Sequence, residues 1–149
     1  MKIAKILSFV LVACFASLSV YADEFASKTE AQAMVEKALK SVKTDRVGTT
    51  DAINAKVKSW VDRDLYPVIY DDTGTVIAHG QNSKMVGKNL IDLKDPKGKE
   101  FVRERMEKAK TNPNGFWQEY DFTDPVSKQV KPKEMYCKSA DPKTIVCAG

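Results

Sequence analysis

The sequence predicts an α+β fold in which a five-stranded antiparallel sheet is combined with a long N-terminal helix and further short helices. Two observations support this prediction. Apolar residues recur at helical spacing in residues 27–47, 50–61 and 99–110. Apolar and polar residues alternate, as they do in strands, in residues 64–79 and again from residue 116 onward.

The N-terminus has the pattern of a secretory signal peptide. Lys2 and Lys5 precede an apolar run from residue 6 to residue 20, and Ala22 follows just before the first acidic residues. The run is shorter than the roughly 20 residues that a membrane-spanning helix needs, and serines interrupt it. We therefore expect a signal peptide at 1–22, a single domain at 23–149, and a periplasmic or secreted protein.

Cys14 offers an alternative to this cleavage site. Residues 11–14 also resemble a lipoprotein cleavage box, in which Cys14 would be lipidated and become the new N-terminus. Cleavage there would leave the apolar residues 15–18 at the start of a soluble protein. We therefore favour cleavage after Ala22.

Composition disfavours several classes of function. The net charge of +4 includes no long block of like charge, so we expect no nucleic-acid partner. The chain has one histidine and none of the usual metal-binding, serine-nucleophile or phosphate-loop patterns. We accordingly expect no enzymatic activity, no cofactor and no metal.

The first helix is expected to begin at a capping box formed by Ser27 and Glu30, and to end near Gly48. Thr50 or Asp51 would then cap a second, shorter helix. Both helices carry an apolar stripe and would cover one face of the sheet.

A β-hairpin is expected from Asp64 to Gly80, with its turn at residues 71–74. Alternation divides its side chains into two sets. One face would carry Tyr66, Val68 and Tyr70, the other Leu65, Pro67 and Ile69, and in the second strand Ile77 and His79 would oppose Val76 and Ala78. Because neither face is cleanly polar, we expect helices on one face and a loop or pocket on the other, without deciding which is which.

After an ordered loop, Asp95 and Pro96 are expected to start a third helix that runs through residues 99–110. Strand alternation resumes at 116–123, where Phe116, Gln118, Tyr120 and Phe122 oppose Trp117, Glu119 and Asp121. The last two strands would form a hairpin around the turn at residues 141–143.

Two cysteines remain once the signal peptide is removed. Cys137 and Cys147 flank the terminal turn, and an even pair in an oxidising compartment predicts a disulfide across the two strands. A redox-active pair is the alternative, but the two residues lack the C-x-x-C spacing that tunes such thiols.

These residues together resemble the single Cache extracytoplasmic sensor domains of the second single-Cache type. The resembling positions are Leu65-Tyr66, 71–79, 86–90, 92–95, Gly98-Lys99, Trp117, Tyr120, Pro125-Val126, 131–133, Tyr136 and Lys138. The resemblance implies a PAS-like fold with a small-ligand pocket between the sheet and the loops and helix over its other face. Members usually bind small organic molecules, commonly short carboxylates, on chemoreceptors, histidine kinases or cyclic-dinucleotide enzymes.

We expect the protein to depart from that pattern in having no transmembrane helix or output module after the domain. Cys137 and Cys147 stand where the family usually has apolar residues, and the last strand ends at Gly149 without the family's aromatic residue. We expect a stand-alone domain that presents its ligand to a separate membrane chemoreceptor or sensor kinase, or that changes its association state, for example as a homodimer.

Six residues are candidate ligand contacts: Tyr66, His79, Trp117, Tyr120, Lys133 and Tyr136. A carboxylate needs cationic or hydrogen-donating partners and apolar or aromatic walls. His79 would bind an anion more strongly when protonated, although a structural histidine is an equal alternative. Lys133 would supply a point charge unless it is a solvated surface lysine, and Trp117 is as readily explained as core.

The sequence therefore favours an exported domain that binds a small organic ligand, with a short carboxylate as the expected class. The alternative is a protein-interaction module with a vestigial pocket, which would dock a partner through a sheet edge or a helix. A filled pocket and an exposed apolar patch would favour this second hypothesis.

The cleavage site is directly testable. We expect the exported protein to begin at Asp23, and intact-mass measurement after expression in a bacterial host checks this. A mass that includes acyl chains on Cys14 would contradict it.

Overall fold

The computed structural model describes residues 25–123 and 127–149. The predicted signal peptide, Cys14 and the pair Pro125-Val126 lie outside these residues. The elements are α1 (Lys28–Thr44), α2 (Arg46–Asn54), β1 (Pro67–Asp71), β2 (Val76–His79), α3 (Phe101–Thr111), β3 (Phe116–Thr123), β4 (Val130–Asp141) and β5 (Thr144–Ala148), with short 3-10 turns η1 (Lys58–Trp60) and η2 (Ser83–Met85).

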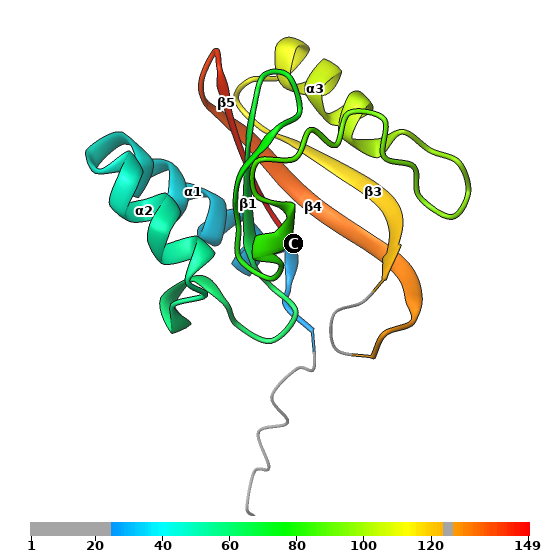
Figure 1. Ribbon diagram of the computed structural model, residues 1–149, viewed down its shortest axis with the longest axis horizontal. Helices are drawn as coiled ribbons and strands as arrows, with labels where there is room; N and C mark the ends of the chain where they lie inside the picture. Colours follow the sequence, from blue (N-terminus) through cyan, green and yellow to red (C-terminus); the bar gives the residue numbers. More distant parts are fainter. Residues whose placement is uncertain (1–24, 124–126) are drawn as a thin grey trace, which may run out of the picture.

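The strands form one five-stranded antiparallel sheet in the order β2-β1-β5-β4-β3. Helices α1 and α2 lie on one side of the sheet, and α3 with the segment after β2 lies on the other (Figure 1). Two apolar clusters result, one under α1 and one under α3. The predicted α+β architecture is confirmed.

The α1 cluster contains Leu65 and Ile69, whereas the α3 cluster contains Tyr66, Val68 and Tyr70. The alternation predicted for the first strand of the hairpin is thus correct. The structure also decides which set of side chains faces the N-terminal helices and which faces the other side. The tyrosine face of the hairpin lies toward α3.

The turn between β1 and β2 forms as predicted. Gly74 adopts a φ of 88°, and the Asp71 carboxylate accepts hydrogen bonds from the backbone amides of Thr73 and Thr75, each at 2.9 Å. A glycine is favoured at Gly74 because other residues are strained in this region of φ.

The alternation predicted for the second strand is wrong. Val68 pairs with His79 and Ile69 with Ala78, but Tyr70 pairs with Val76, so that Ile77 is an extra residue in β2. This bulge puts both Ile77 and Ala78 on the α1 side. His79 therefore lies on the same side as Val76, opposite its neighbour Ala78.

The capping box of α1 is confirmed, since Ser27 and Glu30 exchange both of its hydrogen bonds. The predicted end at Gly48 is wrong, because Asp45 already separates the two helices. Its side chain accepts from the Gly48 amide at 2.9 Å and caps α2, which places Gly48 in the first turn of that helix. The Asp45 carboxylate accepts from a backbone amide that the start of a helix leaves unpaired, and this favours a new helix at that position over a helix end at Gly48.

The predicted start of the third helix is also displaced. Helix α3 begins at Phe101, and Asp95 instead accepts hydrogen bonds from the amides of Lys97, Lys99 and Asp121. Asp95 thus ties the loop before α3 to β3. The residues predicted to face inward from this helix are buried, and Arg105 is buried among them.

The terminal hairpin is joined by the predicted disulfide. Cys137 and Cys147 are paired across β4 and β5, with their Cα atoms 4.1 Å apart. Both cysteines are fully buried in the α3 cluster.

Both outer edges of the sheet are partly covered. Along β2, the Val76 amide donates to Lys88 O and the Asn54 carboxamide oxygen accepts from the His79 amide. Along β3, Lys99 Nζ donates to Glu119 O at 2.6 Å, next to the contact that Asp95 makes with Asp121. Such contacts occupy backbone groups that another strand would need for pairing. Among the described residues, no helix is long and apolar enough to cross a membrane.

We expect Gly48→Ala to destabilise the protein by about 1 kcal/mol, although alanine normally favours a helix over glycine. A Cβ at this position would overlap the Asp45 carboxylate and displace the α2 cap. Denaturant unfolding measures the change. In an Asp45→Ala background, which lacks the cap, the same substitution is expected to be stabilising, and equal effects in both backgrounds would contradict the explanation.

Candidate functional site

The face of the sheet under α3 encloses a small cavity of about 20 Å³. Its polar lining consists of Tyr66, Tyr70, Tyr120 and His79, and the remaining walls are apolar side chains from β1, β3, β4, α3 and the segment after β2. This volume is close to that of one water molecule. Side chains would have to move before even a small organic molecule could enter.

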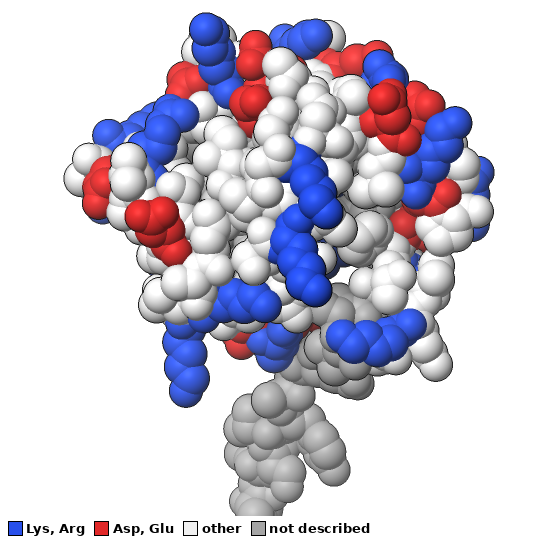
Figure 2. Space-filling model, in the orientation of Figure 1, with Lys and Arg blue, Asp and Glu red and all other residues white. Residues whose placement is uncertain are grey.

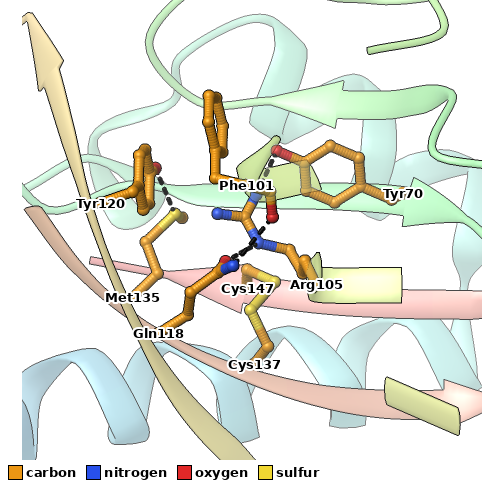
Figure 3. Close-up of a disulfide and its surroundings, with 8 residues drawn as sticks. All are labelled: Tyr70, Phe101, Arg105, Gln118, Tyr120, Met135, Cys137 and Cys147. Carbon is orange, nitrogen blue, oxygen red and sulfur yellow. Dashed lines mark hydrogen bonds between the residues drawn. A yellow bond between two sulfur atoms is a disulfide. The ribbon is translucent and has the colours of Figure 1, made fainter. Parts of the chain in front are cut away.

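A buried arginine lies against this cavity. The guanidinium carbon of Arg105 lies 5.2 Å from the ring centroids of Tyr70 and Tyr120 and 5.6 Å from that of Phe101, and all three rings line the cavity. Figure 3 shows the guanidinium between these rings, with Gln118 and the disulfide on its other side. Its side chain is completely inaccessible to solvent.

Hydrogen bonds hold two of the three guanidinium nitrogens. Nε donates to Gln118 Oε1 at 2.9 Å, and Nη1 donates to the Tyr70 hydroxyl at 2.8 Å. Gln118 is itself held, because its Nε2 donates to Phe101 O at 2.8 Å (Figure 3). Side chains from β1, β3 and α3 therefore fix the orientation of Arg105.

The third nitrogen of Arg105, Nη2, has no hydrogen-bond partner. No carboxylate of a described residue pairs with the guanidinium either. A buried charge without a counterion is costly, and an unpaired buried donor adds to that cost. An anion is the group that would remove both costs, and a carboxylate fits because a guanidinium binds it with planar, charge-assisted hydrogen bonds.

A larger hollow of about 470 Å³ lies outside the small cavity. Tyr66, His79, Met85 and Phe122 line both spaces and so form the partition between them. The other walls of this outer hollow are polar or charged, and they comprise Lys56, Gln81, Asn82, Thr123 and Lys128.

His79 is neutral at neutral pH in this setting. Burial, together with the nearby charge of Lys133, lowers its pKa to about 4. Its Nδ1 accepts hydrogen bonds from the amides of Gln81 and Asn82 at 3.2 and 3.0 Å. The proton of the neutral ring therefore lies on Nε2. The stronger anion binding expected of a protonated His79 would therefore need a pH near 4, where this pKa lies.

Lys133 lies on the same face, opposite Tyr120 in the β3–β4 pairing. Its Nζ is 4.5 Å from the ring centroid of Tyr66 and donates to Gly149 O at 2.7 Å. The ring of Tyr66 stacks on His79, with centroids 5.2 Å apart. Four of the predicted contacts, Tyr66, His79, Tyr120 and Lys133, are thus brought to one side of the sheet.

The remaining two predicted contacts, Trp117 and Tyr136, lie on the opposite side. They pack against each other with ring centroids 5.3 Å apart and adjoin the α1 cluster. Adjacent strand residues point to opposite faces, so Trp117 cannot share the face of Gln118, nor Tyr136 that of Met135. Neither residue lines the cavity beside Arg105, although Trp117 and Lys133 both line a separate hollow of about 380 Å³ at the start of α1.

Arg105 was missed from the sequence. It belongs to the stripe of Phe101, Val102, Met106 and Ala109, all of which are buried. A charged residue within such a stripe was the available signal, because a buried arginine needs a partner. Gln118 carried a similar signal, as a polar residue on the strand face of Phe116 and Tyr120.

A separate hollow of about 480 Å³ lies near the other end of α3. Its floor is formed by Met106, Ala109 and Ile145, and its charged rim includes Asp72 and Lys110. Among the described residues that line it, every buried polar side-chain atom has a hydrogen-bond partner. It therefore offers less specific chemistry than the site beside Arg105.

Comparison with known proteins relates this geometry to a family. The family model described as "Single Cache domain 2" matches residues 19–146. No protein of curated function matches the chain.

Solved structures share the fold. A methyl-accepting chemotaxis protein from Vibrio parahaemolyticus RIMD 2210633 superposes with a TM-score of 0.67 at 18% identity, over 82% of this chain and 86% of that one. A periplasmic sensor domain of a chemotaxis protein gives 0.62 at 20% identity, over 81% and 87%. A Cache chemosensory domain described by its recognition of carboxylic acids gives 0.62 at 19% identity, over 81% and 85%.

The low pKa of His79 predicts a pH dependence of stability. Between about pH 6.5 and pH 4 the unfolded chain binds a proton that the folded chain does not, so lowering the pH removes about 2 to 3 kcal/mol of stability. This contribution is constant above pH 6.5.

Denaturant unfolding at pH 7 and pH 4.5 measures this loss of stability. Other groups also titrate in this range, so a variant that lacks the His79 titration serves as the reference. His79→Asn retains an acceptor for the two amides but does not titrate. We expect the wild type to lose about 2 kcal/mol more than this variant on acidification. Equal losses would contradict the assignment of a neutral, buried His79.

Proposed function

The chain belongs to the family of single Cache domains of the second type, and on this premise we propose that it is an extracytoplasmic sensor domain that binds a small organic carboxylate beside Arg105. The observation that carries the proposal is the buried guanidinium whose Nη2 has no partner. A bound carboxylate would supply both the missing counterion and the missing acceptor.

The aromatic surroundings support the same ligand class. Tyr70 and Tyr120 present hydroxyls close to the guanidinium, and burial raises the pKa of Tyr120 to about 12, so it remains a neutral donor. The Tyr120 hydroxyl now donates only to Met135 Sδ at 3.0 Å, which is a weak acceptor. A carboxylate oxygen would be a stronger acceptor for that donor.

Entry of the ligand requires the partition to open. Met85 and Phe122 are only partly buried and lie between the small cavity and the outer hollow. Met85 belongs to η2, a single short turn within the segment after β2. Displacement of these two side chains would join the two spaces without disrupting the sheet.

We further propose that the protein is exported by its predicted signal peptide and acts by binding rather than by catalysis. The ligand-bound domain would then be read by a separate membrane chemoreceptor or sensor kinase, or would change its own association state. A binding role suits the site, because Arg105 is an anion-binding group that does not exchange protons at physiological pH.

The alternative of a protein-interaction module has one observation in its favour, since the small cavity is almost filled. Burial of Arg105 argues against it. Replacing a buried charge by an apolar residue is often neutral or stabilising, so a domain with no anionic ligand has no evident use for this one. The covered edges of β2 and β3 also leave less backbone for pairing with a partner.

We expect Arg105→Met to abolish carboxylate binding without unfolding the domain. Tyr70 and Gln118 would each lose a partner, but a buried charge would also be removed, so the ligand-free stability should stay within about 2 kcal/mol of wild type. Thermal shift and calorimetry against acetate, propionate, lactate and pyruvate measure binding. At 100 times Kd, a ligand should stabilise the wild type by about 2.7 kcal/mol.

Arg103→Met is the matched control. Arg103 lies on the same helix but is exposed, and it pairs with Glu100 and Asp92 at the surface. This variant should retain full ligand stabilisation. Equal binding by both variants would refute the role of Arg105, and the absence of stabilisation of the wild type by any small acid would refute the proposed function.

A further inference from the structure

We propose that Met85 is an oxidation site that regulates ligand binding beside Arg105. A two-electron oxidant, of the peroxide or hypohalous acid class, would convert the Met85 thioether to a sulfoxide and so weaken the binding of the ligand. The effect on affinity rests on the proposed function, whereas the oxidation of Met85 can be measured without any ligand.

The methionines of the described residues differ in exposure. Met106 and Met135 are only 4% and 1% exposed, which protects their sulfur atoms from dissolved oxidants. Met34 and Met85 are partly buried. Met34 packs against the α1 cluster, whereas Met85 packs against the α3 cluster. Among these four methionines, Met85 is therefore the accessible one on the side of Arg105.

Met85 also lies at the partition between two spaces of very different size. It lines both the small cavity of about 20 Å³ and the outer hollow of about 470 Å³. The other side chains that line both, Tyr66, His79 and Phe122, all carry rings. An unbranched thioether side chain changes its conformation more readily than a ring does. A chemical change at Met85 is thus well placed to alter the partition.

The backbone around Met85 is held in place. The Met85 amide donates to Asn82 O at 3.1 Å, and its carbonyl oxygen accepts from the Lys88 amide at 3.0 Å. The Gly87 amide donates to Val76 O at 2.8 Å and so ties the segment to β2. Modification of the sulfur would therefore act on the side chain, while the segment after β2 stays attached to the sheet.

The surface around Met85 carries positive charge. Lys84 and Lys88 flank it in the chain, and both are exposed. On the face shown in Figure 2, basic side chains predominate in the lower half, whereas acidic ones lie mainly toward the upper and outer margins. Nearby positive charge raises the local concentration of anionic oxidants such as hypochlorite.

The reaction needs only the thioether and the oxidant. With hydrogen peroxide, the sulfur lone pair attacks one peroxide oxygen, an S–O bond forms, the O–O bond breaks and hydroxide leaves. The hydroxide then takes the proton from the new S–OH group and becomes water. Sulfur is oxidised by two electrons and the peroxide is reduced, and methionine sulfoxide reductases reverse the modification.

The sulfoxide should weaken ligand binding. The small cavity has room for about one water molecule, so the added oxygen cannot point inward without displacing its neighbours. The polar sulfoxide would instead turn toward water in the outer hollow and leave a gap in the partition. Water that enters through this gap competes for the Arg105 guanidinium and weakens its attraction for a carboxylate.

Peptide mapping by mass spectrometry, after brief treatment of the folded protein with hydrogen peroxide, locates the oxidation. We expect Met85 to gain an oxygen atom about tenfold faster than Met106 and Met135, because oxidation follows exposure. If Met85 reacts no faster than these two buried methionines, the inference is overturned, with or without a ligand.

Calorimetry with acetate, propionate, lactate and pyruvate measures the effect on binding. For the acid that binds, we expect peroxide treatment to raise Kd about fivefold, and a methionine sulfoxide reductase to restore it. Met85→Leu keeps an apolar side chain of similar volume but has no sulfur, so its Kd should not respond to peroxide. Met34→Leu is the matched control on the other side of the sheet, and it should respond as the wild type does.

Two results separate this inference from the proposed function. If the acid binds but its Kd is unchanged by oxidation of Met85, or if Met85→Leu loses affinity as the wild type does, the inference is overturned and the proposed function stands. If no acid binds the untreated protein, both are overturned.

Discussion

The arrangement of this domain on its α3 side depends on one buried guanidinium. Arg105 joins α3 to β1 through Tyr70 and to β3 through Gln118, and these two strands are separated in the sheet by β5 and β4. The two hydrogen bonds orient the guanidinium, which lies among aromatic rings, and they leave Nη2 without a partner. The domain thus keeps a cation in its core that only an anion from outside the described residues would neutralise.

This charge gives a physical basis for ligand-dependent stability. In the free domain the guanidinium bears a desolvation cost that its two neutral partners offset only in part. A ligand that brings a carboxylate changes the free energy of the whole α3 side, because Arg105 contacts residues from three elements. On the proposed function, ligand binding would therefore be coupled to packing between α3 and the sheet, which is the kind of coupling a sensor requires.

The opposite side of the sheet is built differently. The α1 cluster is formed by apolar side chains with Trp117 and Tyr136 at its margin, and the buried residues of that cluster include no charge. The disulfide joins β4 to β5 beneath Arg105, in the sheet that separates the two clusters (Figure 3). An apolar side and a polar, incompletely satisfied side thus share one sheet, and the proposed carboxylate site lies on the second.

The sequence by itself determined the order of elements, the turn at residues 71–74, the cysteine pair and the faces of β1 and β3, because helical and strand periods are local properties. Only the tertiary structure decided the bulge that turns His79 toward Tyr66, the separation of Trp117 and Tyr136 from the site, and the burial of Arg105. The reason is that the side of a strand or helix on which a residue lies follows from the local sequence, whereas the residues that it contacts come from distant parts of the chain. Arg105 meets Tyr70 across 35 positions of the chain, a distance at which local periodicity carries no information.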